Sequence, residues 1–468
     1  MPGRPADPPT PAPGSRTTGP DAPAGDGPAG GAPAEPVGRL ARTIAGKAGP
    51  LYLSMLATMV GGMVTAGVLG NVGTADLAAH ALVVAVLNPV LMVVQGALRG
   101  SMPFVAEHET DPGALVEVVR HSALLAVLLG FLGGALVASV PLWAGPLGVA
   151  EPTLTALGAY PLLIGAWVVL AAVKSSMTVL LIGLGRGRSV LALSLVSTGL
   201  SVVLTPALIL GVGPAPELGL TGAAVALLVD GALTVPLSVY VVRRRTVLRR
   251  VPVWRGAPRW SGVWAIARVG LPTGSTLLVK FGTLSVLAMA MARTTTADAA
   301  THQLLVVIAS FAFLPAVAAG QTSVPFTARA AGRGDRTGVR RSVAAGYLVS
   351  LPVVVVSTAA VWVASAPVVG LLTADPQVRS GVAALLPVLF VVTVCDAAQS
   401  QPGMGLMGLR NTLPSLYSFG VCYGLLALAA VPLAELGGLT LLWAGYAVAT
   451  LGLVVGQGVA FWRLSARV

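Results

Sequence analysis

Twelve apolar runs, each about long enough to cross a bilayer, limit this chain to one class of fold. A transmembrane helix needs about 20 mostly apolar residues, and it satisfies its own backbone hydrogen bonds where no water is present. Only 10% of the 468 residues are charged and the mean hydropathy is +0.85, which indicates an all-α polytopic membrane protein. The expected spans are 49–70, 77–105, 119–141, 155–184, 189–211, 221–242, 265–291, 298–328, 342–364, 379–407, 413–433 and 438–462.

Two segments without an apolar run divide the chain. Residues 1–38 contain eleven prolines, a composition typical of disordered segments, so we expect a disordered Pro/Ala/Gly-rich tail. A basic linker is expected at 246–264, between the sixth and seventh spans. The predicted domains on either side of it are an N-terminal six-helix bundle, 39–245, and a C-terminal six-helix bundle, 265–468.

Lysine and arginine residues lie almost entirely in alternate loops. If the N-terminus and every second loop share one side, that side holds 25 of the 29 basic residues, Arg99 among them. Only Arg293 and Arg379 lie on the other side. Basic loops are retained in the cytosol. The sequence therefore predicts a multi-pass plasma-membrane protein whose two termini, tail and linker are cytosolic.

The chain repeats itself at an offset of 222 residues. Residues 75–106 and 297–328 align without a gap, so that ADLAAHALVV corresponds to ADAATHQLLV and SMPFVA to SVPFTA. The same offset places Pro50 on Pro272. Because each half has an even number of spans, the two halves have the same orientation. Such repeats commonly frame a substrate site near the middle of the membrane.

Four charged side chains fall deep inside the apolar spans, one base and one acid in each half: Lys174, Asp230, Lys280 and Asp396. A charge at the bilayer centre costs about 2.5–3.5 kcal/mol on insertion scales, so such residues face protein or water and mark functional sites. We expect Lys280 and Asp396 to lie within ion-pair distance, and Lys174 and Asp230 to form a second centre. A purely structural lysine is the alternative.

Polar residues share helical faces with these charges or lie on the matching face of the first span. They are Thr276, Thr283, Thr393, Gln399, Thr58 and Thr65. Polar stripes on corresponding helices of two halves predict the walls of an aqueous cleft. We therefore expect these residues, with the four charges, to bind substrate or a coupling ion, and Thr65 to be a neutral wall position.

The order of these features resembles the multidrug and toxic compound extrusion (MATE) exporters of the MOP superfamily. The resemblance rests on a proline that opens spans 1 and 7, on Asp396-Ala-Ala-Gln399 in span 10 and on Gly219-Leu-Thr-Gly-Ala-Ala224 at the start of span 6. It covers about residues 40–465. The resemblance implies a V-shaped pair of bundles that exports small amphipathic compounds, often cationic, by alternating access in exchange for protons or sodium.

Two positions depart from the family pattern and change the expected coupling. Members usually carry an acid where this chain has Thr65, and many bacterial members carry a glutamate where it has Lys280. A fixed ammonium repels sodium and competes with it for the Asp396 carboxylate. We therefore expect a proton antiporter rather than a sodium antiporter, without a metal site or a cofactor.

Two other functions stay open at the level of sequence. The same fold could flip or export a lipid-linked or anionic metabolite, which a lysine in the cavity would suit. A membrane-embedded transferase needs clustered carboxylates or a histidine pair, and the chain has neither D-x-x-D nor H-E-x-x-H. We expect a transporter and not an enzyme, with a small-molecule substrate, no nucleic-acid partner and a monomeric state.

Overall fold

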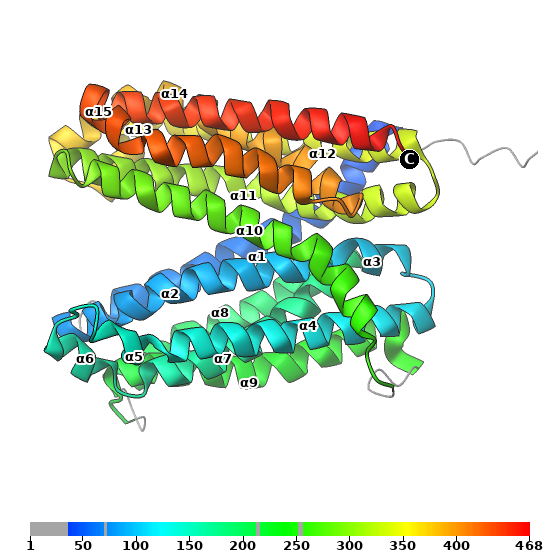
Figure 1. The fold of residues 1–468 in the computed structure, drawn as a ribbon, viewed down its shortest axis with the longest axis horizontal. Coiled ribbons are helices and arrows are strands. Elements are labelled where there is room, and N and C mark those ends of the chain that lie inside the picture. Colours follow the sequence, from blue (N-terminus) through cyan, green and yellow to red (C-terminus); the bar gives the residue numbers. More distant parts are fainter. Residues whose placement is uncertain (1–35, 70–72, 212–215, 251–255) are drawn as a thin grey trace, which may run out of the picture. The chain divides into compact units, whose positions relative to one another are not determined.

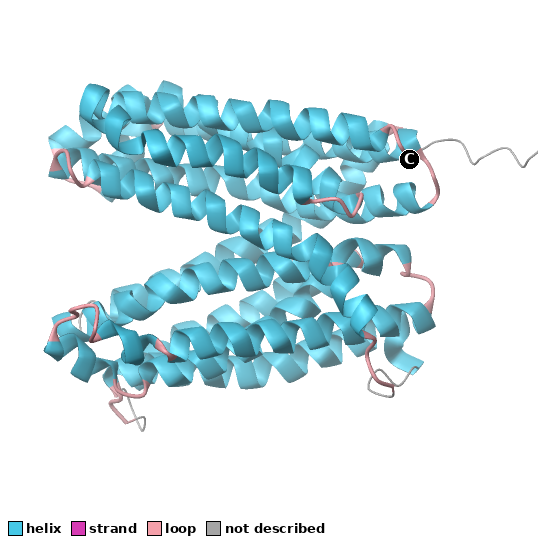
Figure 2. Cartoon of the chain, in the orientation of Figure 1, coloured by secondary structure: helices cyan, strands magenta, loops and turns pink. Residues whose placement is uncertain are grey.

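The computed structural model describes residues 36–69, 73–211, 216–250 and 256–468, which belong to one compact unit. These residues form helices and loops without a strand (Figure 2), and eleven of the helices are long and apolar enough to cross a membrane. The chain is thus an all-α multi-pass membrane protein. The helices of the first half are α1 (Val37–Leu69), α2 (Thr74–Arg99), α3 (Met102–Glu107), α4 (Pro112–Ala138), α5 (Val140–Ala144), α6 (Glu151–Leu157), α7 (Tyr160–Gly183), α8 (Gly187–Leu210), α9 (Gly219–Arg245) and the short 3-10 helix η1 (Val247–Arg250).

The last helix of the second half contains a break that divides it into two spans. Gly437 and Gly438 of α15 have non-helical backbone angles, and Gly438 has a φ of +59°, which glycine adopts without strain. The expected spans 413–433 and 438–462 lie on either side of this break, which confirms the predicted twelve-helix arrangement. The helices of the second half are α10 (Trp260–Met291), α11 (Thr296–Gly332), α12 (Arg336–Val363), α13 (Ser365–Leu372), α14 (Pro376–Gly408) and α15 (Leu413–Ser465).

Two expected boundaries are wrong because helices begin before their apolar spans. α1 starts at Val37 and includes the last two residues of the expected tail 1–38, whereas residues 1–35 lie outside the described part. α10 starts at Trp260, inside the expected linker 246–264, and η1 occupies part of the same segment. Both early segments are amphipathic, with buried positions between exposed ones, so hydropathy alone does not reveal them.

The first turns of α1 and α10 pack on the opposite half of the molecule. Ile44 of α1 is buried in a small apolar cluster with Ala345 of α12. Ile266 of α10 belongs instead to the large apolar core of the first half. Pro50 and Pro272, which correspond in the repeat, follow these two segments. The first part of α1, up to Pro50, and the first part of α10, up to Pro272, are therefore exchanged arms, each packed on the other half. The boundary between the two packed halves does not coincide with the linker in the sequence.

The two halves lie close together at one end and diverge toward the other (Figure 1). The close end carries the C-terminus and the start of α10. Two ion pairs join the halves there: Glu107 of α3 pairs with Arg410, and Glu109 pairs with Arg329 of α11. The Arg410 guanidinium also lies over the ring of Phe104, 4.1 Å from its centroid. Charged contacts thus connect the two halves at this end.

Near this end, α2 and α10 cross at a contact formed by glycine residues. Gly96 of α2 faces Gly274 of α10, and Gly100, directly after the last residue of α2, faces Gly270. A Cβ atom at Gly274 would lie 2.6 Å from the carbonyl oxygen of Val93, so only glycine fits there. A four-residue spacing of small residues on both helices lets membrane helices approach closely. The crossing between the halves is therefore a contact of backbone against backbone.

Candidate functional site

The charged centre of the second half is a buried ion pair between α10 and α14. Lys280 Nζ donates a hydrogen bond to Asp396 Oδ2 at 2.5 Å. The other carboxylate oxygen, Oδ1, accepts a hydrogen bond from Gln399 Nε2 at 2.9 Å. The ammonium group also lies 4.1 Å from the ring centroid of Phe313, a cation–π contact. Both oxygens of the carboxylate are therefore satisfied, as a buried charge requires.

The three expected threonines near this centre have different surroundings. Thr276 faces a small pocket, and its hydroxyl donates to the carbonyl oxygen of Pro272 at 2.8 Å. Thr283 donates to the carbonyl oxygen of Tyr423 at 3.3 Å, and Thr393 contacts the hydroxyl of Thr358 at 3.3 Å. Thr283 and Thr393 thus pair with neighbouring helices and help to hold α10, α12, α14 and α15 together.

A cavity of about 470 Å³, here called the central cavity, lies between the two halves. Its lining combines Lys280 and Asp396 with side chains of α2, α10, α11 and α15 from both halves, among them Met92, Phe281 and Tyr446. This volume and a mostly apolar lining with a few polar groups are typical of small-molecule sites. The central cavity therefore has the size and position of a substrate site.

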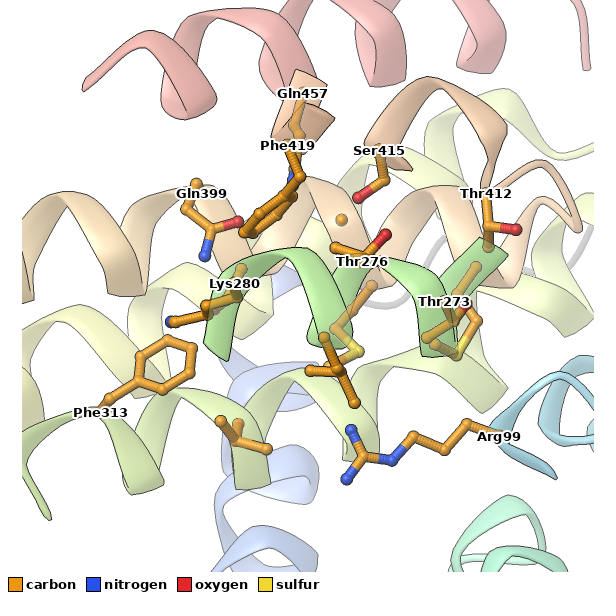
Figure 3. Close-up of a pocket in the computed structure, with 16 residues that line it drawn as sticks. Arg99, Thr273, Thr276, Lys280, Phe313, Gln399, Thr412, Ser415, Phe419 and Gln457 are labelled. Carbon is orange, nitrogen blue, oxygen red and sulfur yellow. The ribbon is translucent and has the colours of Figure 1, made fainter. Parts of the chain in front are cut away.

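A smaller pocket of about 100 Å³ adjoins the central cavity and shares Arg99, Lys280 and Phe313 with it. Gln399 lines this pocket beside Lys280, so the group that fixes the Asp396 carboxylate also faces open space. Figure 3 shows the Lys280 side chain next to the ring of Phe313, with the Arg99 guanidinium turned toward the same group of residues. Three of the sequence-predicted residues, Thr276, Lys280 and Gln399, thus lie on one pocket wall.

The structure places Arg99, which the sequence analysis counted among the basic loop residues, on a cavity wall. Arg99 is the last residue of α2, and its side chain lines both pockets instead of facing solvent. The signal that was missed is a helical spacing: Asn88, Gln95 and Arg99 recur on one face of α2, and all three line the central cavity. A basic residue at a span end looks like an orientation signal in sequence, but the α2–α10 crossing brings this one inside.

The charged centre of the first half is an ion pair bridged by a hydroxyl group. Lys174 Nζ of α7 lies 3.2 Å from Asp230 Oδ2 of α9. Ser197 of α8 accepts a hydrogen bond from Lys174 at 2.6 Å and donates one to the same Asp230 oxygen at 2.9 Å. Asp230 Oδ1 has no hydrogen-bond partner among the described residues. This pair lines a separate cavity of about 420 Å³, here called the N-half cavity.

The remaining expected residues of span 1 lie on the wall of the N-half cavity. Thr58 and Thr65 of α1 both line it, and each hydroxyl donates to a backbone carbonyl one turn earlier, at 2.9 and 3.2 Å. Gln95 and Leu91 of α2 line the N-half cavity and the central cavity alike. Helix α2 therefore separates the two cavities, and the two charged centres face different spaces.

Two related six-helix halves with a cavity between them, lined by buried charges, define a polytopic membrane transporter. A family model supports this assignment: the model for MatE matches residues 50–207 and 273–433, more than half of the chain. The chain belongs to the MatE family. Members of this family are transporters, so the chain is a membrane transporter and not an enzyme.

Individual relatives are similar over most of the chain. The probable multidrug resistance protein NorM of Aromatoleum aromaticum is 25% identical over 399 residues, which cover 83% of this chain and 85% of that protein. A MATE protein crystallised in complex with MaD5 has a TM-score of 0.82 and 18% identity, with 91% of this chain and 96% of that chain covered. A MOP superfamily transporter from Pyrococcus furiosus, described as having a binding pocket of reverse polarity, has a TM-score of 0.79 and 19% identity, with coverage of 91% and 96%. These structures share the fold.

Proposed function

We propose that this chain is a secondary active exporter that moves small amphipathic organic compounds out of the cell in exchange for protons. The observation that carries the proposal is the central cavity of about 470 Å³ between the halves, whose wall includes the buried Lys280–Asp396 pair. The relative NorM is named for multidrug resistance, which supports efflux as the direction of transport. The volume of the cavity favours a small molecule over a lipid-linked one.

Alternating access supplies the transport cycle. The halves diverge away from the end at which α10 starts, and α9, which precedes it, finishes with Arg243, Arg244 and Arg245 (Figure 1). Basic connections are cytosolic, so the divergent end would face outward and the ion-paired end inward. In this proposal the structure represents the outward-facing state, and the inward-facing state requires the contacts of Glu107 and Glu109 with the second half to open.

Proton coupling follows from the chemistry of the Lys280–Asp396 pair. The ammonium group occupies the place beside Asp396 that a sodium ion would need, and one carboxylate oxygen is already engaged by Gln399. A sodium ion would have to displace a positive charge that is covalently attached to α10. A proton can instead neutralise Asp396 directly and remove its attraction for Lys280. Release of Lys280 would then change the packing between α10 and α14.

The decisive experiment is transport in proteoliposomes with one gradient at a time. Purified protein is reconstituted, and a panel of amphipathic dyes of both charge signs is followed under a pH gradient alone or a sodium gradient alone. We expect dye movement with the pH gradient and none with sodium. Asp396→Asn, which cannot release a proton, should abolish the response to the pH gradient, whereas the matched variant Asp230→Asn in the N-half cavity should keep most of it.

Two results would contradict parts of this proposal. Dye movement driven by sodium alone would reject proton coupling but leave the exporter intact. No gradient-driven movement of any dye, with protein shown to be folded and inserted, would reject the exporter itself.

A further inference from the structure

We infer that Arg99 is an anion anchor of the central cavity and that the transported compound is an amphipathic organic anion, with a carboxylate, sulfonate or phosphate group on an apolar body. This inference rests on the proposed export function and specifies its substrate class. It assigns a binding role to Arg99, the residue at the end of α2 that lines both the central cavity and the small pocket beside it.

The charges that face the central cavity leave one cation unmatched. Its charged lining residues are Arg99, Lys280 and Asp396. Lys280 and Asp396 neutralise each other at 2.5 Å. Among the described residues, no carboxylate lies within ion-pair distance of Arg99. The space between the halves therefore has a net positive charge, which attracts an anion and repels a cation.

The face of α2 that carries Arg99 supplies hydrogen-bond donors toward the same space. Asn88 and Gln95 lie on this face, and both line the central cavity. A guanidinium group presents its donors in a planar fork that binds carboxylate and phosphate through two parallel hydrogen bonds. Arg99 with the Gln95 amide therefore forms a donor surface suited to a planar or tetrahedral oxyanion.

The rest of the cavity suits an apolar or aromatic body. The lining also includes Phe281 of α10 and Phe313 of α11, while Met59 and Met92 supply flexible thioether side chains. Methionine side chains adapt to ligands of different shape. A compound with its anionic group at Arg99 could thus place its apolar part against these aromatic rings.

A structural role alone accounts poorly for Arg99. An arginine in the last turn of a helix interacts favourably with the helix dipole, and one near a membrane surface can extend to water. The Arg99 guanidinium is instead turned toward the pocket that contains Lys280, another cation (Figure 3). Lys280 is already neutralised by Asp396, whereas no carboxylate among the described residues pairs with Arg99, so a bound anion would supply the missing counter-charge.

The first test compares two xanthene dyes of similar size and opposite charge. Fluorescein is an anion at pH 8, and rhodamine 123 is a cation. Fluorescence anisotropy with purified protein in phosphatidylcholine nanodiscs gives a Kd for each dye without any gradient. We expect the Kd of the unaltered protein for fluorescein to be at least tenfold lower than its Kd for rhodamine 123. Equal Kd values, or tighter binding of rhodamine 123, would overturn the inference without the need for a variant.

The second test locates the anion at Arg99. Arg99→Gln should raise the Kd for fluorescein at least tenfold and leave the Kd for rhodamine 123 unchanged or lower, while Arg99→Lys should retain part of the affinity. The matched control is Arg293→Gln, because Arg293 is exposed and lines neither cavity. Unchanged fluorescein binding by a folded Arg99→Gln protein would show that another group holds the anion, contrary to the inference.

A third arm separates a soluble anion from a lipid headgroup, since both carry the same chemistry. In nanodiscs that contain phosphatidylglycerol, the Kd for fluorescein should stay within twofold of its value in phosphatidylcholine nanodiscs. Displacement of the dye by this lipid would assign Arg99 to a lipid phosphate and overturn the inferred substrate. Failure of the inference and failure of the exporter stay distinguishable: pH-driven movement of cationic dyes alone rejects the anionic substrate, whereas selective fluorescein binding without any gradient-driven transport rejects the exporter.

Discussion

Each half of the molecule contains one lysine–aspartate pair inside the membrane, but the two pairs are not symmetry copies. The 222-residue offset places Lys174 on Asp396, a base on an acid, and Thr58 on Lys280. The first pair joins α7 to α9, whereas the second joins α10 to α14. The repeat therefore preserves charge balance within each half and not the positions of the charges.

The surroundings of the two pairs differ in exposure and in hydrogen bonding. The side chains of Lys280 and Asp396 are only 9% and 8% exposed, and both carboxylate oxygens are satisfied. The Lys174 side chain is 26% exposed, Ser197 bridges the pair, and one Asp230 oxygen has no partner among the described residues. The pair in the second half is costly to break, whereas the pair in the first half tolerates exchange with water. The pair in the second half lines the central cavity and the pair in the first half lines the N-half cavity, which is why the proposed coupling is assigned to the former.

The largest expected effect follows from removing one member of the buried pair. Asp396→Ala leaves Lys280 without a counter-ion in a buried site, which typically costs about 3–5 kcal/mol. The melting temperature of the purified protein in detergent should therefore fall strongly. Asp230→Ala should lower it less, because Lys174 keeps the Ser197 hydroxyl and partial access to solvent.

The double variant provides the control for this comparison. Lys280→Ala combined with Asp396→Ala removes both charges and should be more stable than the Asp396→Ala protein. Additive losses in this cycle would show that the two residues do not interact energetically. Equal losses from Asp396→Ala and Asp230→Ala would remove the distinction between the halves.

A smaller effect is expected from the hydroxyl that exists in only one of the two centres. Ser197→Ala removes a hydrogen bond to each member of the Lys174–Asp230 pair, and losing a hydrogen bond to a charged group costs about 1.5–3 kcal/mol before water replaces it. Water from the N-half cavity can replace the hydroxyl. The measured decrease in the free energy of unfolding should therefore be at the low end of this range or below it. Ser194→Ala, in the same helix and cavity, is the control and should change stability little. If Ser197→Ala lowered stability as much as Asp396→Ala, the Lys174–Asp230 pair would be as inaccessible to water as the Lys280–Asp396 pair.

The smallest effect is expected from charges that join the two halves instead of lying within one. Glu107→Gln with Glu109→Gln removes both ion pairs at the close end. Exposed pairs contribute about 0.2–1 kcal/mol each, so opening at this end should increase by about 1.4- to 5-fold per pair. Labelling of Ser310→Cys in the central cavity, in a protein without Cys395 and Cys422, measures this change from each side of the membrane.

Exposed pairs are also screened by salt, which supplies a second check. The increase in labelling should be smaller at high ionic strength. Glu151→Gln, at the start of the distant helix α6, should not change labelling. Unchanged labelling after removal of both pairs would indicate that the close end is held by apolar contacts and not by charge.

The parts that were predictable from sequence are those set by one-dimensional patterns. Apolar run length determined the number of spans, and charges inside the spans indicated where buried ion pairs are needed. Arg99 could not be placed, because its position depends on how α2 crosses α10. Thr283 and Thr393 have the spacing of cavity residues, yet they bond to Tyr423 and Thr358, and only helix packing distinguishes these two outcomes. The exchanged arms of α1 and α10 were also hidden, since amphipathic turns do not indicate which half they cover.

The glycine crossing of α2 and α10 has a consequence for the speed of the transport cycle. At an ordinary helix contact, interlocked side chains must change rotamer before one helix can rotate on the other, and each change adds to the activation barrier. Gly96, Gly100, Gly270 and Gly274 present no side chains to interlock. Rotation there costs little, so the turnover rate should depend on contacts far from the axis, at the rims of the cavity and at the closed end. Natural selection could then adjust the rate through peripheral residues while these four positions tolerate no replacement.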